Sequence, residues 1–385
     1  MDISHYIGNR DVFPVLAKWD FFNHAGVAPI PRPASDAIRG FASEAESVAY
    51  LGTRWYADIE KLRILSANLI HAHRDEIAFV KNTSEGISIV AHGIEWQWGD
   101  VIVTTNAEYP ANIYPWLEVV KMRGVRLVQV PEEAAADGTR RVPLDKILEA
   151  ASQKQCKLVA LSHVEYASGQ RHDVQRIGEF CRSRGILFSV DAIQALGVIP
   201  VDVQAMKIDF LAADGHKWLL GAEGAGIFYC RKDLLERMRP LMIGWMNVIN
   251  AQDYGDIDFT LKSDAGRFEC GSYNVAGLLA LKASMETLMS VGIPQIFDRV
   301  KHLTDRLVEG LEIKGYKVVS PRDFGHWSGA VSFVGKTHDS AEIVRSLRKN
   351  HRIEIALREN RLRASPHFYN TDAQIDRLID TLPVG

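Results

Sequence analysis

Short apolar runs alternate with helix-period segments between residues 60 and 240, and this alternation constrains the fold more than any other feature of the chain. Residues 173–184, for example, carry apolar side chains at helical spacing and stop at Gly185. Strands separated by helices predict an α/β fold with a mostly parallel sheet and helices on both faces. The runs that are typical of buried strands are 76–80, 100–105, 125–130, 157–164, 186–191 and 209–213, with a further strand, expected to be antiparallel, at 224–230.

The pattern changes after residue 275. A long helix is predicted at 274–292, and a smaller α+β portion follows that ends in a helical segment at 371–382. No repeats, low-complexity tracts or flexible linkers separate the two parts. We therefore expect a large domain at 16–274, packed tightly against a small α+β domain at 275–385 that also includes residues 1–15.

Charge and cysteine content exclude several classes of function. Lys and Arg total 45 against 48 Asp and Glu, so the net charge is −3, and no basic field is available for nucleic acid or a membrane surface. The N-terminus lacks the apolar run of a signal peptide, and no stretch is apolar enough to span a bilayer. The four cysteines are far apart, which predicts no disulfide framework, no metal site and a cytoplasmic protein: Cys156, Cys181, Cys230 and Cys270.

Ligands of open α/β sheets bind outside the carboxyl ends of the strands, so the residues after each apolar run are informative. After the first run, Asn82 is a candidate helix N-cap, with Glu85 placed as in a capping box. Free N–H groups and hydroxyls at Thr83 and Ser84, with the helix dipole, predict a phosphate site. A plain helix cap is the alternative.

Two later strand ends also carry polar groups. Asp191 ends an apolar strand, where a carboxylate needs a cationic partner such as a protonated ring nitrogen, or else caps a helix. Lys217 follows another strand beside His216 and Trp218, and partial desolvation would depress its pKa and expose a nucleophilic amine. An ordinary surface lysine is the alternative. The nearby glycines follow a turn and make no dinucleotide fingerprint.

A phosphate site, then an Asp that ends a strand, then a Lys that ends the next strand but one, is the chain order of pyridoxal-phosphate (PLP) enzymes of fold type I. From FFNHAGVAPIP near the start to RASPHFYNTDAQIDRL near the end, the sequence resembles the class V aminotransferase family. That family includes cysteine desulfurases, selenocysteine lyases, kynureninase and isopenicillin N epimerase-like proteins. The resemblance implies the aspartate-aminotransferase-like fold, with a seven-stranded sheet in the PLP-binding domain.

The resemblance also implies roles for residues around the cofactor. Lys217 matches the lysine that holds PLP as a Schiff base and moves the Cα proton, and Asp191 matches the carboxylate that keeps the ring nitrogen protonated. Gln194 matches a partner of the ring's phenolic oxygen. Phosphate contacts fall on Thr83, Ser84 and His216.

Further roles concern stacking, the substrate and a second subunit. Tyr109 matches a catalytic aromatic that stacks on the ring, with core packing as the alternative. Ser272 matches a contact to the phosphate of the neighbouring subunit, which implies a homodimer with shared sites, or it is a turn residue. Arg363 matches the clamp for the substrate α-carboxylate, or else pairs with Glu359. By position, Asn23 and His24 belong to the substrate pocket, although a buried, satisfied histidine is the alternative.

The sequence departs from cysteine desulfurases at three places. The stretch 350–365 contains no cysteine where those enzymes carry a catalytic one, so persulfide transfer by a loop thiol is not expected. Tyr166 replaces an Asn, and Asp214 replaces a phosphate-binding Ser. The residues do not decide between reaction outcomes, and the family resemblance implies an aminotransferase acting on an amino acid. A C–S lyase or an epimerase is the alternative, followed by a PLP-binding protein without turnover.

Overall fold

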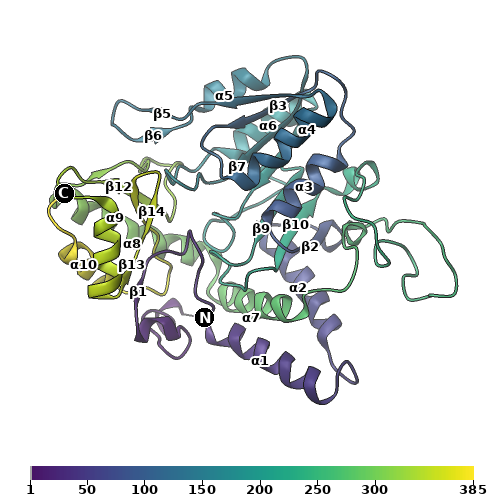
Figure 1. Ribbon diagram of the computed structural model, residues 1–385, viewed down its shortest axis with the longest axis horizontal. Helices are drawn as coiled ribbons and strands as arrows, with labels where there is room; N and C mark the ends of the chain where they lie inside the picture. Colours follow the sequence, from purple (N-terminus) through teal and green to yellow (C-terminus); the bar gives the residue numbers. More distant parts are fainter. Residues whose placement is uncertain (1) are drawn as a thin grey trace.

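The computed structural model describes residues 2–385 and is built around one seven-stranded sheet (Figure 1). The strand order is β2-β10-β9-β8-β7-β3-β4. Each strand falls on one of the predicted apolar runs, which confirms all seven: β2 (Ile77–Val80), β3 (Val101–Thr105), β4 (Arg126–Val130), β7 (Cys156–Ser162), β8 (Leu187–Asp191), β9 (Phe210–Asp214) and β10 (Gly226–Cys230).

The direction of the strands also follows the prediction. β3 pairs in parallel with β4 and β7, and β8 pairs in parallel with β7 and β9. β10 is antiparallel to both of its neighbours, β9 and β2. The carboxyl ends of the other six strands therefore meet at one edge of the sheet.

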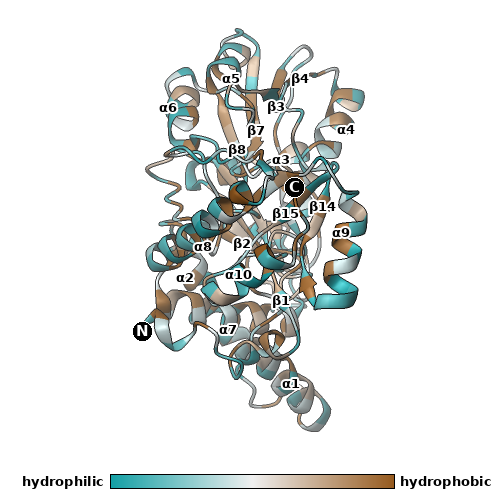
Figure 2. Cartoon of the chain, turned by 90° about the vertical axis from the view of Figure 1, so that its left-hand side faces the viewer, coloured by the Kyte–Doolittle hydropathy of each residue, from teal (hydrophilic) through white to brown (hydrophobic). Residues whose placement is uncertain are grey.

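Helices cover both faces of this sheet, as the apolar period predicts. Ile77 and Phe79 belong to one buried core and Ala78 to the other, because successive side chains of a strand point to opposite faces. Figure 2 shows the strands as hydrophobic and the outer helix faces as hydrophilic. The helices of this part of the chain are α1 (Arg32–Ser47), α2 (Trp55–Leu69), α3 (Thr83–Gly93), α4 (Tyr114–Arg123), α5 (Leu144–Ala151), α6 (Val174–Arg184) and α7 (Val275–Val291). Of these, α1 packs on α7 and not on the sheet.

The helix predicted at 173–184 shows why these elements begin and end where they do. The Asp173 side chain accepts a hydrogen bond from the backbone N–H of Arg176 at 3.1 Å and so caps the first turn of α6. Gly185 ends the helix with φ 69°, a left-handed conformation that glycine adopts without steric cost.

A smaller sheet lies beside the large one and has its own core (Figure 1). It is antiparallel, in the order β11-β12-β15-β14, and Leu307, Phe333 and Leu362 pack in its core. Its elements are β11 (Lys317–Val318), β12 (Val331–Val334), β14 (Ala356–Arg358), β15 (Arg361–Ala364), α8 (Ile293–Ile313), α9 (Ser340–Ser346) and α10 (Asp372–Thr381).

Short elements complete the chain. β1 (Asp20–Phe21) pairs in parallel with β13 (Ile353–Glu354), so the N-terminal segment packs against the C-terminal part of the chain. Helix α7 packs against α1 and α2. The domain boundaries expected from the sequence stay predictions. The remaining elements are β5 (Glu133–Ala134), β6 (Arg140–Arg141), η1 (Ile3–His5), η2 (Pro14–Ala17), η3 (Arg74–Glu76), η4 (Pro110–Asn112), η5 (Lys232–Arg237), η6 (Ala265–Phe268) and η7 (Leu347–His351).

Helix length and apolarity bear on a membrane span. Within residues 2–385, no single helix is both long and apolar enough to cross a bilayer. Helices α7 and α8 reach the length and apolar composition of a membrane span only when they are taken together, and the chain bends by 80° at their junction.

Candidate active site

A pocket of about 500 Å³ lies between the carboxyl ends of the central strands and the β14–β15 hairpin of the smaller sheet. Asp191 ends β8, Asp214 ends β9, and Arg363 comes from β15. The structure brings nine of the predicted site residues into the lining of this pocket: Asn23, Thr83, Ser84, Tyr109, Asp191, Gln194, His216, Lys217 and Arg363.

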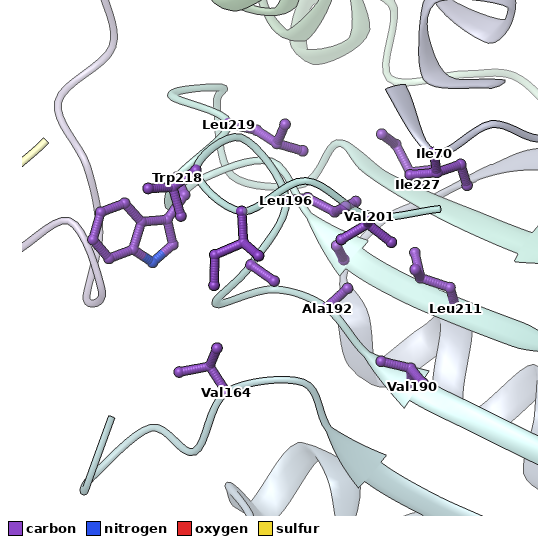
Figure 3. Packing of buried hydrophobic residues seen from close by; sticks show 14 of the residues in the cluster. Ile70, Val164, Val190, Ala192, Leu196, Val201, Leu211, Trp218, Leu219 and Ile227 are labelled. Carbon is purple, nitrogen blue, oxygen red and sulfur yellow. The ribbon is translucent and has the colours of Figure 1, made fainter. Parts of the chain in front are cut away.

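Lys217 lies in the turn that follows β9, and its neighbours hold this turn in place. Trp218 and Leu219 are 1% exposed and pack in the core with Leu196 and Val190 (Figure 3). The Lys217 side chain reaches the pocket, where its Nζ lies 5.7 Å from the centroid of the Tyr109 ring. An anchored backbone with a side chain in the pocket is unlike a surface lysine.

The Lys217 amine is easier to deprotonate than an ordinary lysine. Burial lowers its pKa to about 8, the Asp191 charge opposes this shift, and the charges of Arg363 and Arg358 add to it. Within the described part of the chain, Lys217 forms no ion pair. The neutral, nucleophilic fraction of this amine near neutral pH is therefore much larger than that of an ordinary lysine, although the protonated form still predominates.

Asp191 is a buried carboxyl group with capacity for another partner. One carboxyl oxygen accepts a hydrogen bond from the backbone N–H of Ile193 at 2.9 Å. Burial raises its pKa to about 6, against the smaller opposing effects of this bond and of Lys217. Turns, not a helix, follow at 193–198, so the helix-cap alternative does not apply. A protonated ring nitrogen would stabilise the charged form.

The amino end of α3 carries the residues that are predicted to form an anion site. Asn82 caps the helix by accepting a hydrogen bond from the Glu85 N–H at 3.0 Å. The expected capping box is shifted by one residue, since the Glu85 carboxylate accepts from the N–H of Lys81. The Thr83 hydroxyl accepts from the Asp214 N–H at 3.0 Å, which ties α3 to the end of β9. Ser84 is exposed in the pocket.

Asp214 does not face this anion site as a free charge. Its carboxylate accepts from the Gly215 N–H at 2.7 Å and lies 2.9 Å from Nδ1 of His216. The substitution of an acid at this position is thus accommodated by a local partner. His216 lines the pocket beside it.

Gln194 is held by two hydrogen bonds. Its amide nitrogen donates to the carbonyl of Ala25, and its oxygen accepts from the indole N–H of Trp218, both at 2.9 Å. The second N–H of the amide remains available in the pocket, which suits a donor to a ring oxygen.

Arg363 is a buried guanidinium with unused donors. It is 1% exposed, and its Nη1 donates to the carbonyl of Tyr166. Nε and Nη2 have no partner within residues 2–385. Burial and the charge of Arg358 lower its pKa to about 9. Glu359 does not pair with Arg363, because it accepts from the hydroxyl of Tyr166 at 2.7 Å and lies 3.4 Å from Arg361. Two adjacent unpaired N–H groups match the fork of a carboxylate.

Tyr109 and Asn23 complete the pocket wall. Tyr109 is 50% exposed, which excludes the core-packing alternative, and its ring meets that of Tyr166 edge-on at 5.3 Å between centroids. The Asn23 amide donates to Glu354 at 3.4 Å, while its buried carbonyl oxygen has no partner among the described residues.

The structure does not bring His24 and Ser272 into this pocket. His24 is fully buried, with Nδ1 2.8 Å from the Ser365 carbonyl and Nε2 2.6 Å from the Tyr369 hydroxyl. The alternative of a satisfied buried histidine describes this arrangement. Ser272 is exposed and does not line the pocket. Its contact with a neighbouring subunit stays a prediction.

Sequence reasoning missed Arg358 and Glu354, which also line the pocket. Both lie close to the pairing of β14 with β15. Three arginines in this short stretch, at 358, 361 and 363, were a usable sequence signal for an anion-binding surface. It also missed a buried polar group behind the pocket, built around Glu165 and Glu108. No periodicity marks such residues, because their partners are distant in the sequence.

These features are those of a known family. The profile described as Aminotransferase class-V matches residues 21–378, nearly the whole chain. The chain belongs to the class-V aminotransferase family. It is therefore a PLP-dependent enzyme, and the lysine, the buried carboxyl group and the helix end fit the aldehyde, the ring nitrogen and the phosphate of that cofactor.

The relatives of this class-V enzyme carry two kinds of name. A probable cysteine desulfurase of Methanothermobacter thermautotrophicus is 32% identical, over 97% of this chain and 96% of that protein. The cysteine desulfurase CsdA of Escherichia coli is 31% identical, over 97% and 96%. An uncharacterized aminotransferase of Bacillus subtilis is 29% identical, over 97% and 96%.

Solved structures confirm the predicted fold of the enzyme. The apo structure of a cysteine desulfurase from Thermococcus onnurineus superposes with a TM-score of 0.86 at 27% identity, over 96% of this chain and 95% of that one. A cystine C–S lyase, C-DES, has a TM-score of 0.87 at 24% identity, over 96% and 98%, and supports the fold alone. The names of the relatives favour C–S bond cleavage over transamination, so our expectation of a plain aminotransferase is less well supported than its alternative.

Proposed function

We propose that this chain is a C–S lyase, which cleaves the Cβ–S bond of a cysteine-derived amino acid and releases the sulfur to solution. The observation that carries the proposal is the lining of the pocket in this chain, which contains no cysteine. The relatives of the chain are nevertheless named cysteine desulfurases. Burial raises the pKa of the Cys156 thiol to about 11, and the thiols of Cys181 and Cys230 are buried with raised pKa values. Cys270 is only partly buried, but it does not line the pocket either, so within residues 2–385 no thiol is placed to take sulfur from the substrate.

The cofactor would be held by residues from four elements. Lys217 would bind it covalently, Asp191 would pair with the ring nitrogen, and Gln194 would donate to the ring oxygen. The start of α3, through Thr83 and Ser84, would hold the phosphate. When bound, PLP supplies an electron sink that eases removal of the Cα proton.

The substrate would be oriented by the chain's own groups. Arg363 would clamp the α-carboxylate through its two unpaired donors, Nε and Nη2. The Lys217 amine, with its lowered pKa, would take up the Cα proton. Tyr109, half exposed over the pocket, would cover the reacting centre and limit the entry of water.

The overall reaction balances without an oxidant. The Cα–H and Cβ–S bonds break, and the sulfur leaves with the bonding electron pair and takes a proton as a thiol. The remaining 2-aminoacrylate takes up water and gives pyruvate and ammonium. Sulfur transfer to an enzyme cysteine is not required.

Product analysis of the PLP-loaded enzyme with cysteine and S-substituted cysteines tests this proposal. We expect pyruvate, ammonium and thiol in equal amounts, with no turnover by Lys217→Ala and normal turnover by Lys154→Ala, which changes an exposed lysine. In the wild type, a borohydride-sensitive absorbance band should report the covalent cofactor, and Lys217→Ala should lack it. Pyruvate absent from every S-substituted substrate would overturn the proposal.

The Bacillus subtilis relative gives aminotransfer as the second candidate. The same assay separates the two, because aminotransfer yields a 2-oxo acid and an aminated cofactor without ammonium. A product with inverted Cα and no bond cleavage would instead indicate an epimerase.

We propose further that the enzyme works as a homodimer. Ser272 is exposed and lies outside the pocket of its own chain, and the neighbouring loop exposes several apolar side chains: Ile243, Trp245, Tyr254, Ile257 and Phe259. Apolar groups of this size gathered on one loop are typical of a surface that a partner covers.

A further inference from the structure

Arg358 is a second arginine in the pocket, beside the one that would clamp the α-carboxylate. In the pairing of β14 with β15 it stands opposite Arg361, and Ala356 stands opposite Arg363. Directly opposite residues, and alternate residues along a strand, point to the same face. Three guanidinium groups therefore share one face of this hairpin.

The three arginines differ in what neutralises them. Arg361 is 3.1 Å from Glu132 and 3.4 Å from Glu359, and it does not line the pocket. Arg358 donates to the carbonyl of Leu357 at 2.8 Å, and within residues 2–385 it forms no ion pair. Arg358 and Arg363 therefore carry the uncompensated charges of the hairpin.

The acidic groups of the pocket are committed elsewhere or solvated. Asp214 contacts His216 at 2.9 Å, and Glu354 is held by two contacts from Arg348 at 2.6 and 2.7 Å. Asp191 is the partner that the cofactor ring requires. Glu223 is exposed to solvent. None of the four is paired with the free arginine of β14.

The charge of Arg358 acts on the centre of the pocket. Burial is the largest cause of the lowered pKa values of Arg363 and Lys217, and the charge of Arg358 lowers both further. One substrate carboxylate would neutralise Arg363 and leave the second guanidinium unpaired. An anion on that guanidinium would remove the repulsion between the two arginines.

We propose that Arg358 binds an oxyanion at the end of the substrate side chain. The preferred substrates would then be amino acids with two acidic groups, the α-carboxylate on Arg363 and a distal carboxylate, sulfinate or phosphonate on Arg358. The inference rests on the proposed function, because it takes the α-carboxylate to be bound by Arg363. Among cysteine derivatives, it selects those whose sulfur carries an acidic substituent.

Calorimetric titration of the PLP-loaded enzyme with succinate and with butyrate tests this site without any turnover. Both compounds lack an amino group, and only succinate has a second carboxylate. We expect succinate to bind the wild type at least ~10-fold more tightly than butyrate, since a charged pair in a partly desolvated site contributes about that much. Arg358→Gln should abolish the difference and leave butyrate binding unchanged, and Arg361→Gln should keep it.

Two further ligands extend the test to other oxyanions. 3-Sulfinopropionate and 2-carboxyethylphosphonate, used in place of succinate, identify the preferred oxyanion, and each should lose its advantage in Arg358→Gln. Equal binding of all these diacids and butyrate by the wild type would overturn the oxyanion site, whatever the products of turnover. Retained discrimination without pyruvate formation would overturn the lyase proposal alone.

Discussion

At the scale of single residues, Arg363 is the group whose surroundings say most about the substrate. A guanidinium that is 1% exposed and has two unpaired donors is costly to bury. The only interaction that partly offsets this cost within the described chain is the hydrogen bond to the Tyr166 carbonyl. A bound carboxylate would satisfy the other donors, so the cost is offset when substrate is present.

Arg363→Lys keeps the positive charge and removes the planar fork. We expect KM for the amino-acid substrate to rise by about 10- to 100-fold, because a bidentate pair becomes a single contact. The absorbance of the bound cofactor should not change. Arg361→Lys, on the same strand but paired with Glu132, serves as the control. An unchanged KM in Arg363→Lys would contradict the clamp.

The lowered pKa of Lys217 predicts the pH dependence of cofactor attachment. The reactive form is the neutral amine, whose fraction rises with pH and levels off above a pKa of about 8 instead of the ordinary 10.5. The rate at which the apo protein acquires the PLP band should therefore rise through pH 7 and 8 and then reach a plateau. Stopped-flow absorbance measures this rate, and a continued rise to pH 10 would show an unperturbed lysine.

At the scale of elements, a cluster of buried polar side chains supports the turn between β7 and α6. The Glu165 carboxyl group accepts from the Thr105 hydroxyl and lies 2.9 Å from Nε2 of His172, linking this turn to the end of β3. Burial raises the pKa of Glu165 to about 8 and lowers that of His172 to about 4. Both groups are therefore neutral near pH 7, which suits their burial.

The raised pKa of Glu165 predicts a contribution to stability that is lost as the pH rises. The unfolded chain releases this proton near pH 4.5, and the folded chain holds it until about pH 8. Between these values Glu165 binds more protons in the folded state, so its contribution to the free energy of unfolding falls with increasing pH, opposite in sign to the contribution of His172, whose pKa is lowered. Glu165→Gln, an isostere of the protonated acid, should remove this pH-dependent contribution.

Urea unfolding of the apo protein at pH 5 and pH 8 measures the effect. The free energy of unfolding at pH 8 minus that at pH 5 should be more positive in Glu165→Gln than in the wild type, because the variant lacks the contribution that Glu165 loses over this range. Glu149→Gln, which changes an exposed glutamate, should behave like the wild type. Equal differences in all three proteins would mean that Glu165 is charged in the folded state at pH 7.

At the scale of the whole molecule, the pocket depends on how the two sheets meet. Tyr166, which follows β7, donates through its hydroxyl to Glu359 and accepts from Arg363 through its carbonyl. Glu359 and Asn360 adopt φ 49° and 59°, the left-handed values of the tight turn that joins β14 to β15. This turn is therefore joined to the large sheet directly over the pocket.

The proposed homodimer predicts twice the monomer mass in solution. Ile257→Asp with Phe259→Asp places two charges on the exposed loop and should shift the protein toward monomer, with a loss of activity if Ser272 completes the neighbouring site. Light scattering with size-exclusion chromatography measures the mass. Phe324→Asp, at a side chain that is 99% exposed on a different loop, is the matched control. A monomeric wild type would contradict the proposal.

The sequence by itself determined where the seven central strands lie along the chain, that one of them runs antiparallel, and which residues after the strands to expect together at one edge of the sheet. The physical reason is that these signals are local: buried strands read as apolar runs, and the polar residue that follows each run reaches the same edge of the sheet. Thr83, Asp191 and Lys217 could therefore be placed together before any contact was known.

Only the tertiary structure decided the contacts between residues far apart in the chain. His24 is satisfied by Ser365 and Tyr369 instead of facing the pocket. Within residues 2–385, Arg358 forms no ion pair, whereas Arg361 pairs with Glu132. Such outcomes depend on which side chains a fold places within about 3 Å of one another, the range of a hydrogen bond. No periodicity along the chain encodes those distances, because the partners are joined by packing and not by sequence.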